Sequence, residues 1–207
     1  MPDPRTQAPR PAGCGAIVLA AGGSSRMGAA KLLLEVGGQT LIRRTVDAVL
    51  GSGAWPVVVV LGSDADLVRA QIAGLGVVEA RNEAWSTGMA SSIRAGISAV
   101  VAADPSAQAV LVTPCDLPAL SAEAIRLLAG AHRRTGLVAA ARYGGRTGAP
   151  AVFGRGDFRA LGELQGDEGA RRLLNSDPAK VAAVDLPDLA LDIDTPSDYE
   201  AWRDRQK

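Results

Sequence analysis

The sequence has few of the residues that define disulfide-rich, zinc-binding and histidine-dependent proteins. It contains only two cysteines, Cys14 and Cys115, and they lie far apart in the chain. This excludes a disulfide framework and a metal-finger spacing, and it favours a reduced, cytoplasmic location. The single histidine, His132, excludes a histidine-rich metal site. Because His132 lies beside two arginines in an expected helix, we predict an ordinary surface role for it.

The sequence also lacks an excess of charge and a long apolar run. Lys and Arg together number 22, as do Asp and Glu, so the basic excess of a general nucleic-acid binder is absent. No run approaches the roughly 20 apolar residues that span a bilayer. We therefore expect neither nucleic acid nor a membrane as a partner. Residues 2–11 are rich in Pro and Arg without the apolar middle of a secretion signal, so we expect 1–12 to be a flexible tail and 13–207 a single domain.

Apolar runs alternate with helical patterns along most of the chain. Unbroken runs at 16–21, 56–61 and 109–112 are typical of strands buried on both faces of a parallel sheet. Residues 41–50 and 89–103 instead have the spacing of helices. This order predicts an α/β protein whose ligands bind beyond the carboxyl ends of its strands. The other expected strands are 77–78, 137–141, 149–153 and 189–193, and the other expected helices are 64–72 (capped by Asp64), 121–134 (opened by Ser121), 158–164, 168–174 and one opened by Pro196.

The segment after the first strand, residues 19–31, combines small residues with two cations. Gly22 and Gly23 let the backbone approach a ligand closely, and free N–H groups in such a bend bind anions. Arg26 and Lys31 add positive charge, so the segment suits a triphosphate. It is neither a Walker loop nor a Gly-x-Gly-x-x-Gly loop. The alternative interpretation is a turn with solvated charges.

Acidic residues follow two expected strands. Asp116 comes directly after the strand at 109–112, and a carboxylate beside a phosphate site is most simply a magnesium ligand. The alternative is that Asp116 caps the next helix. Alternation along the expected strand 189–193 places Asp192 and Asp194 on one face, so either can supply a second carboxylate. Cys115 has no evident base beside it and is better read as a packed small residue than as a nucleophile.

A polar, glycine-bearing turn at 85–88 opens the helix 89–103. Its free N–H groups and hydroxyls can bind the edge of a nucleobase, although an ordinary capped helix explains the same letters.

These segments together resemble the MobA/MocA-type nucleotidyltransferases over about residues 14–203. The resemblance implies a three-layer, Rossmann-like, mostly parallel sheet of the nucleotide-diphospho-sugar transferase type. The segments at 88–96 and 166–171 are the more particular, and they point to the branch that resembles molybdenum cofactor cytidylyltransferase. The matching segments are LAAG (19–22), RMG with a following lysine (26–31), GMASS (88–92), CDLP (115–118), GAPAVF (148–153), GDEGAR (166–171) and DIDTP (192–196).

The resemblance implies a role for each matching residue. Ser92 would lie near the cytosine ring, and the stretch 145–150 would face the acceptor. Asp116 and Asp194 would bind Mg²⁺, with Asp194 matching better than Asp192. The family more often has Asp-Gln-Pro or Asp-Met-Pro where this chain has Asp-Leu-Pro, a departure that concerns the acceptor side. The residues expected to bind nucleotide are Leu19, Ala20, Ala21, Gly22, Gly23, Ser24, Arg26, Lys31 and Ser92, and those expected in catalysis are Arg26, Lys31 and Asp116.

The activity that the resemblance implies is transfer of CMP from CTP to molybdopterin or molybdenum cofactor, with release of pyrophosphate. One alternative keeps the chemistry but uses GTP, or a sugar or alditol phosphate as the acceptor. Another is a non-catalytic, nucleotide-binding accessory protein for a molybdoenzyme, and a molybdoenzyme or its chaperone is an expected partner in either case. The sequence does not show which nucleobase is bound, because backbone groups would make most of the contacts to the base.

Overall fold

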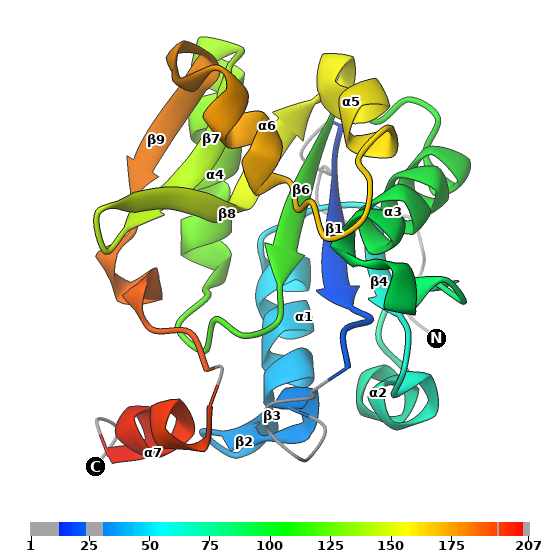
Figure 1. The fold of residues 1–207 in the computed structure, drawn as a ribbon, viewed down its shortest axis with the longest axis vertical. Coiled ribbons are helices and arrows are strands. Elements are labelled where there is room, and N and C mark those ends of the chain that lie inside the picture. The colour runs from blue at the N-terminus through cyan, green and yellow to red at the C-terminus, as the bar shows by residue number, and fades with distance from the viewer. Residues whose placement is uncertain (1–12, 24–30, 194, 205–207) are drawn as a thin grey trace, which may run out of the picture.

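Seven strands form one sheet in the computed structural model, which describes residues 13–23, 31–193 and 195–204 (Figure 1). The strand order is β5-β4-β1-β6-β8-β7-β9. Strand β8 runs antiparallel to both of its neighbours, whereas the other pairs in the sheet are parallel. The mostly parallel sheet predicted above is therefore confirmed. The strands are β1 (Cys14–Ala20), β4 (Val57–Leu61), β5 (Val78–Arg81), β6 (Ala109–Pro114), β7 (Val138–Tyr143), β8 (Arg146–Gly154) and β9 (Val181–Asp185).

Helices cover both faces of this sheet, which explains the unbroken apolar runs. Val57 and Val59 of β4 pack in the core that contains residues of α1, α2 and α4. The alternate residues Val58 and Val60 pack on the other face, in the core that contains residues of α3, α5 and α6. The helices are α1 (Leu41–Gly51), α2 (Ala65–Ile72), α3 (Met89–Ala103), α4 (Ala122–Thr135), α5 (Phe158–Gly162), α6 (Arg171–Ser176) and α7 (Pro196–Asp204), and the 3₁₀ turns are η1 (Lys31–Leu33), η2 (Trp85–Thr87), η3 (Arg155–Asp157), η4 (Pro178–Lys180) and η5 (Pro187–Ala190).

A small unit lies beyond the carboxyl ends of β1 and β6 (Figure 1). It consists of α7 and the hairpin of β2 (Glu35–Val36) and β3 (Gln39–Thr40). Its core joins Val36, Leu41, Ile193 and Trp202. No helix in the described ranges is long and apolar enough to span a membrane.

The strand expected at 189–193 is wrong. A 3₁₀ turn occupies Pro187–Ala190, and Leu189 and Ile193 are buried without belonging to a sheet. An apolar run indicates only that its residues are buried. Here a buried turn has the same kind of apolar sequence as a strand. The observed last strand is β9, an edge strand without a fully buried residue, which the apolar pattern did not reveal. Without a strand at 189–193, strand alternation gives no reason to place Asp192 and Asp194 on one face.

Several local predictions can be checked at single residues. Ser121 accepts a hydrogen bond from the Ala124 backbone N–H at 3.2 Å and caps α4, which is confirmed. Asp64 occupies the N-cap position of α2, as expected, but its side chain makes no capping hydrogen bond. The strands expected at 137–141 and 149–153 are confirmed as parts of β7 and β8, which pair in an antiparallel register. The expected tail, 1–12, lies outside the described residues, and the division into one domain stays a prediction.

Candidate functional site

The segments singled out in the sequence meet where β1 and β6 end. These strands are parallel neighbours, and Leu19 pairs with Pro114 in the register. The residues that follow them, Ala21–Gly23 and Asp116, therefore emerge at the same edge of the sheet. In the order β5-β4-β1-β6, β1 lies where the direction of strand addition reverses, which is where open α/β sheets bind ligands.

A cavity of about 400 Å³ opens at this edge. We call it the first cavity. The β1 end and its following bend form one wall, α3 forms another, and the β6 end forms a third. The residues predicted from the sequence that line it are Leu19, Ala21, Gly22, Gly23, Lys31, Ser92 and Asp116.

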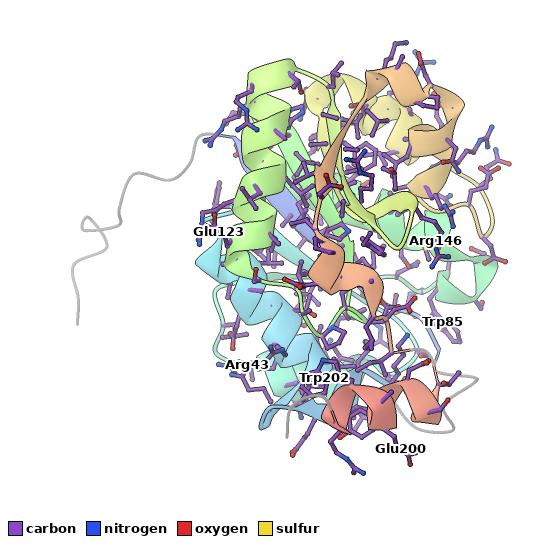
Figure 2. All side chains as sticks on the ribbon, turned by 90° about the vertical axis from the view of Figure 1, so that its left-hand side faces the viewer. Arg43, Trp85, Glu123, Arg146, Glu200 and Trp202 are labelled. Atoms are coloured by element: carbon purple, nitrogen blue, oxygen red, sulfur yellow. The ribbon has the colours of Figure 1, made fainter. Side chains whose placement is uncertain are left out.

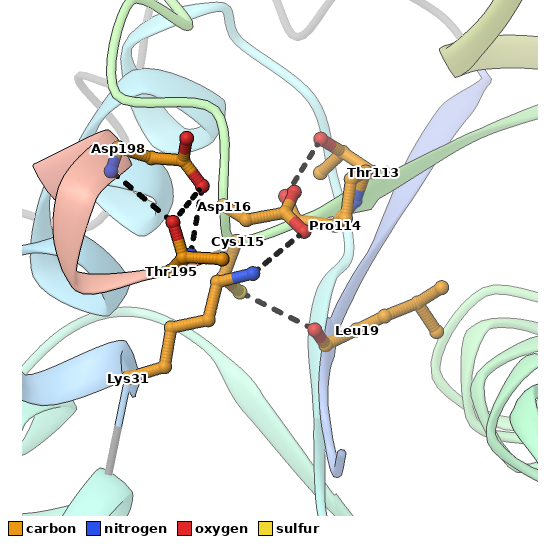
Figure 3. A network of polar contacts seen from close by, with 8 residues as sticks. All are labelled: Leu19, Lys31, Thr113, Pro114, Cys115, Asp116, Thr195 and Asp198. Carbon is orange, nitrogen blue, oxygen red and sulfur yellow. Dashed lines mark hydrogen bonds and ion pairs between the residues drawn. The ribbon is translucent and has the colours of Figure 1, made fainter. Parts of the chain in front are cut away.

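Lys31 and Asp116 face each other in the first cavity (Figure 3). The Lys31 Nζ lies 3.1 Å from the Asp116 Oδ2, and 14% and 27% of the two side chains are exposed. The sequence separates them by 85 positions, and η1 and the end of β6 bring them together. One cation and one carboxylate thus occupy the same partly buried place, as a phosphate and metal site requires.

The C-terminal segment is held against the same strand end. The Ile193 backbone N–H donates to the Asp116 backbone carbonyl at 3.0 Å, which brings the segment with the predicted second carboxylate to Asp116. Asp194 itself, like Ser24 and Arg26, lies outside the described residues. Thr195 and Asp198 begin α7 with reciprocal bonds: the Thr195 N–H donates to the Asp198 carboxylate at 2.8 Å, and the Asp198 N–H donates to the Thr195 hydroxyl at 3.3 Å.

Ser92 is held by a residue that the sequence interpretation missed. The buried Asn82 amide donates to the hydroxyl oxygens of Ser91 and Ser92 at 2.8 and 3.0 Å, and its carbonyl oxygen accepts from the Ala84 N–H at 3.0 Å. Ser92 accepts this bond, so its own proton remains available to a ligand in the first cavity. Asn82 directly follows β5, and its place after a strand is the signal that could have pointed to it.

Two further lining residues, Trp85 and Asp167, lie in the segments 85–88 and 166–171 that the sequence singled out, but neither was predicted as a site residue. Trp85 lies in η2, is 37% exposed, and contacts the region of Gly23. Asp167 comes from the loop between α5 and α6, which packs directly on the start of α3: the Ala90 N–H donates to the Gly166 carbonyl at 3.0 Å. The amino-acid sequence alone does not show that this loop lies at the cavity.

A second cavity of about 250 Å³ adjoins the first, since Leu19, Met89 and Pro114 line both. It lies under the β7–β8 hairpin, whose residues 146–149 line it, as the resemblance implies for the acceptor side. Tyr143 donates to the Ala149 carbonyl at 2.7 Å and holds this hairpin. Burial, with smaller contributions from the Asp116 and Asp192 carboxylates, raises the pKa of Tyr143, so its hydroxyl stays protonated.

Neither cysteine is an activated nucleophile. Burial raises the pKa of the Cys14 thiol to about 11. Cys115 lines the first cavity, and burial followed by the Asp116 carboxylate raises the pKa of its thiol well above the ordinary range. His132 is partly buried and its Nδ1 lies 2.7 Å from the Leu137 carbonyl, a structural contact at the end of α4.

The carboxylate of Asp116 suits a metal site in which phosphate oxygens and water supply most of the ligands. No group of three or more His, Cys, Asp or Glu side chains in the described ranges can hold a metal on its own. Mg²⁺ needs only one or two carboxylates when phosphate oxygens and water complete its shell. Asp116, partly exposed in the first cavity, fits that requirement. The alternative role of Asp116 as a helix cap is excluded, because Ser121 caps α4.

Most of the predicted nucleotide-binding residues therefore share one cavity. Ala20 is the exception within the described ranges, since its side chain is buried in the core on the α1 side of the sheet. Asp192 is exposed and lines the second cavity. The fold and this cavity define a nucleotide-binding α/β protein of the Rossmann-like, nucleotide-diphospho-sugar transferase class.

The chain belongs to the family described as the MobA-like NTP transferase domain, whose model matches residues 16–189. It is accordingly a nucleotidyltransferase by family and by fold.

Several proteins of known structure or sequence match this chain over most of its length and most of their own. The structure of Rv0371c from Mycobacterium tuberculosis H37Rv is 30% identical, with a TM-score of 0.79, and the match covers 91% of this chain and 96% of that one. Rv0371c has also been crystallised as a complex with manganese. A nucleotidyl transferase from Methanothermobacter thermautotrophicus, Mth528, is 27% identical over 94% of this chain and 97% of its own, with a TM-score of 0.80. A protein of Paenarthrobacter nicotinovorans named nicotine blue oxidoreductase is 34% identical over 86% of this chain and 91% of its own.

Proposed function

We propose that the protein is a Mg²⁺-dependent cytidylyltransferase that transfers CMP from CTP to molybdopterin and releases pyrophosphate. The observation that carries the proposal is the first cavity, where the bend after β1, the Lys31 ammonium and the Asp116 carboxylate converge. The choice of CTP and molybdopterin is supported by the resemblance of segments 88–96 and 166–171 to that branch of the family. The reduced cysteines favour a cytoplasmic location, and a molybdoenzyme or its chaperone is the expected protein partner.

In this proposal each wall of the first cavity has its own task. The backbone of Leu19–Gly23 would bind base and ribose, and the Ser92 hydroxyl would donate to the base. Lys31 would neutralise charge on the triphosphate, a task that Arg26 shares in this proposal. Asp116, together with Asp194, would hold Mg²⁺, which supplies further neutralisation of phosphate charge when it is bound.

The reaction needs alignment and charge neutralisation more than covalent help from the protein. A phosphate oxygen of the acceptor forms a bond to the α-phosphorus of the nucleotide. The bond from that phosphorus to the oxygen bridging to the β-phosphate breaks, and the electron pair leaves with pyrophosphate. Lys31 stabilises the growing negative charge on the leaving group. No protein nucleophile takes part, which agrees with the protonated thiol of Cys115.

A panel of substrates tests this proposal. Pyrophosphate release is measured with CTP, GTP, ATP or UTP in the presence of Mg²⁺, with and without molybdopterin. We expect release with CTP only when molybdopterin is present, and loss of release when EDTA removes the metal. Release with GTP, or with a sugar or alditol phosphate as acceptor, would replace the proposed substrates. Nucleotide binding without release would indicate an accessory protein.

The name of the Paenarthrobacter relative makes a redox reaction the second candidate. Because the thiols of Cys14 and Cys115 are far apart and protonated, they form no dithiol pair, and a bound cofactor would have to supply electrons. Oxidation of a reduced nicotinamide dinucleotide by nicotine blue, followed by absorbance, is the discriminating assay. Turnover in this assay without pyrophosphate release in the panel would favour the redox reaction.

A further inference from the structure

The loop between α5 and α6, residues 163–170, brings an acidic residue to the first cavity. Figure 1 shows this loop descending from α5 to the start of α3. Asp167 of the loop lines the cavity and is exposed. Trp85, which lines the same cavity and is 37% exposed, lies at the edge of the molecule in Figure 2. A ligand that enters from this side therefore meets Asp167.

Backbone contacts fix the position of Asp167. The Arg94 guanidinium donates to the Leu164 carbonyl at 2.5 Å and holds the beginning of the loop on α3. A Cβ added to Gly88 would lie 2.3 Å from the Gly166 carbonyl oxygen and 2.7 Å from the Asp167 backbone nitrogen, so the loop and the turn before α3 are in direct contact. None of these contacts uses the Asp167 side chain, so its carboxylate can be replaced without removing them.

The Asp167 carboxylate bonds to no other group in the described part of the chain. The next residue, Glu168, is paired with Arg172. Asp116, the other acid of the first cavity, is paired with Lys31. Within residues 13–23, 31–193 and 195–204, Asp167 has neither an ion pair nor a hydrogen bond. Its two oxygens are therefore available to a ligand.

A carboxylate in this cavity opposes the binding of a triphosphate, because the two carry charge of the same sign. Asp167 is favourable there only if it bonds to donor groups on another part of the nucleotide. Ribose has two adjacent hydroxyl groups, and these can donate to the two oxygens of one carboxylate. An acidic side chain binds ribose in this way in dinucleotide-binding α/β proteins.

The connectivity of a nucleotide places its ribose near this loop. In the proposed function, Ser92 contacts the base and Lys31 contacts the triphosphate. The ribose joins these two parts and must lie between them. Gly88, which touches the loop, is the N-cap of α3 and lies about one helical turn before Ser92. Asp167 therefore approaches the nucleotide beside the base end, away from Lys31.

We propose that the Asp167 carboxylate accepts hydrogen bonds from the 2′- and 3′-hydroxyl groups of the nucleotide, and that it makes the protein selective for ribonucleoside over deoxyribonucleoside triphosphates. This inference rests on the proposed nucleotidyl transfer and concerns the sugar, which neither the choice of base nor the choice of acceptor determines. Asp167 is a specificity residue in this arrangement, since it contacts the substrate away from the phosphorus at which bonds form and break.

The test compares the binding of CTP, 2′-deoxy-CTP and 3′-deoxy-CTP by calorimetry, with Mg²⁺ present and no acceptor, so that no transfer takes place. We expect the wild-type protein to bind CTP about tenfold or more tightly than either analogue, because each analogue lacks one donor to the carboxylate. In Asp167→Ala the three Kd values should become equal, and Asp167→Asn, which keeps one acceptor oxygen, should show an intermediate preference. The ratio of Kd values is the readout, because removal of a negative charge strengthens the binding of all three triphosphates alike.

The matched control is Asp188→Ala, which removes an exposed carboxylate of η5 that lines neither the first nor the second cavity. Like Asp167, Asp188 has no ion pair or hydrogen bond among the described residues. Its preference for CTP should stay at the wild-type value, and circular dichroism checks that all variants are folded. Equal Kd values for the three nucleotides in the wild-type protein, or a preference for CTP that persists in Asp167→Ala, would overturn the assignment.

The same titrations separate this inference from the proposed function. If GTP binds more tightly than CTP, the comparison is made with GTP and its two deoxy analogues, and it decides the role of Asp167 although the proposed base is replaced. Binding of the ribonucleotide without pyrophosphate release from any acceptor would count against the proposed function alone. Failure of every nucleoside triphosphate to bind would overturn both.

Discussion

Lys31 and Asp116 carry opposite charges, are partly buried, and lie 3.1 Å apart. A pair of this kind neutralises its own two charges before a nucleotide arrives. Removing one partner takes this ion pair away from the other in a partly desolvated place. Substitutions at these two positions therefore test both the charge balance and the proposed chemistry.

Asp116→Asn keeps the shape of the side chain and removes its charge. We expect the fold to persist and turnover with CTP to fall about a hundredfold to a thousandfold, the usual loss for one charge-stabilising group. Pyrophosphate release and circular dichroism measure the two effects. Asp66→Asn is the control, since it removes an exposed carboxylate on α2 that pairs with Arg69. Turnover of Asp116→Asn at the wild-type rate would contradict the metal assignment.

Lys31→Gln removes the cation that faces Asp116. If Lys31 binds the triphosphate, the Kd for CTP should rise by about tenfold or more, while the Kd for cytidine should change little, because cytidine carries no phosphate. Equilibrium binding of both ligands measures the difference. Lys180→Gln, which removes an exposed lysine paired with Asp177, is the matched control. An equal rise for both ligands would show that Lys31 supports the cavity without contacting phosphate.

The contact between the α5–α6 loop and the start of α3 joins the two cavities at the scale of elements. A Cβ on Gly88 would lie 2.3 Å from the Gly166 carbonyl carbon, so only glycine permits this approach. Gly88 also has φ +111°, a left-handed conformation that other residues rarely adopt. The contact places Asp167 in the first cavity and Arg171 in the second.

Gly88→Ala should separate these elements. We expect a loss of about 2 kcal/mol or more in the free energy of unfolding, from backbone strain together with the steric clash. The KM values for both substrates should rise, because the loop lines both cavities. Urea denaturation and steady-state kinetics are the measurements. Gly74→Ala supplies the control: it has φ +78° with open space around it, so it carries the strain without the clash. Equal losses in both variants would show that the contact contributes little.

At the scale of the whole molecule, one sheet connects every part of the site. Its two faces bury separate cores, and a third core under α7 joins Trp202 to Val36, Leu41 and Ile193. The third core is small, but Ile193 is also hydrogen-bonded to the end of β6. This link ties α7 to the central sheet.

The described residues should accordingly unfold as one cooperative unit. In a Trp55→Phe/Trp85→Phe variant, Trp202 is the one remaining tryptophan of three and reports on α7 by fluorescence. We expect its transition in urea to coincide with the transition in far-ultraviolet circular dichroism, the usual behaviour of a single domain. An earlier fluorescence transition would show that α7 unfolds independently and would contradict the single-domain prediction.

Sequence patterns were most informative where a residue's neighbours in the chain decide its role. The buried strands β1, β4 and β6 follow from unbroken apolar runs, and Ser121 follows from its place before a helix. The strand predicted at 189–193 was wrong because a buried turn and a buried strand both require apolar residues. The pattern failed at β9 because an edge strand needs less apolar surface.

The sequence by itself determined the parallel core, the bend after β1 and the acidic residue after β6, because local hydrophobicity and backbone freedom act over a few neighbouring residues. Only the tertiary structure decided that Lys31 meets Asp116, that Asn82 holds Ser92, and that Arg146 and Arg171 share one cavity. Those contacts join residues from different elements, and their distances depend on how the helices and loops pack against the sheet.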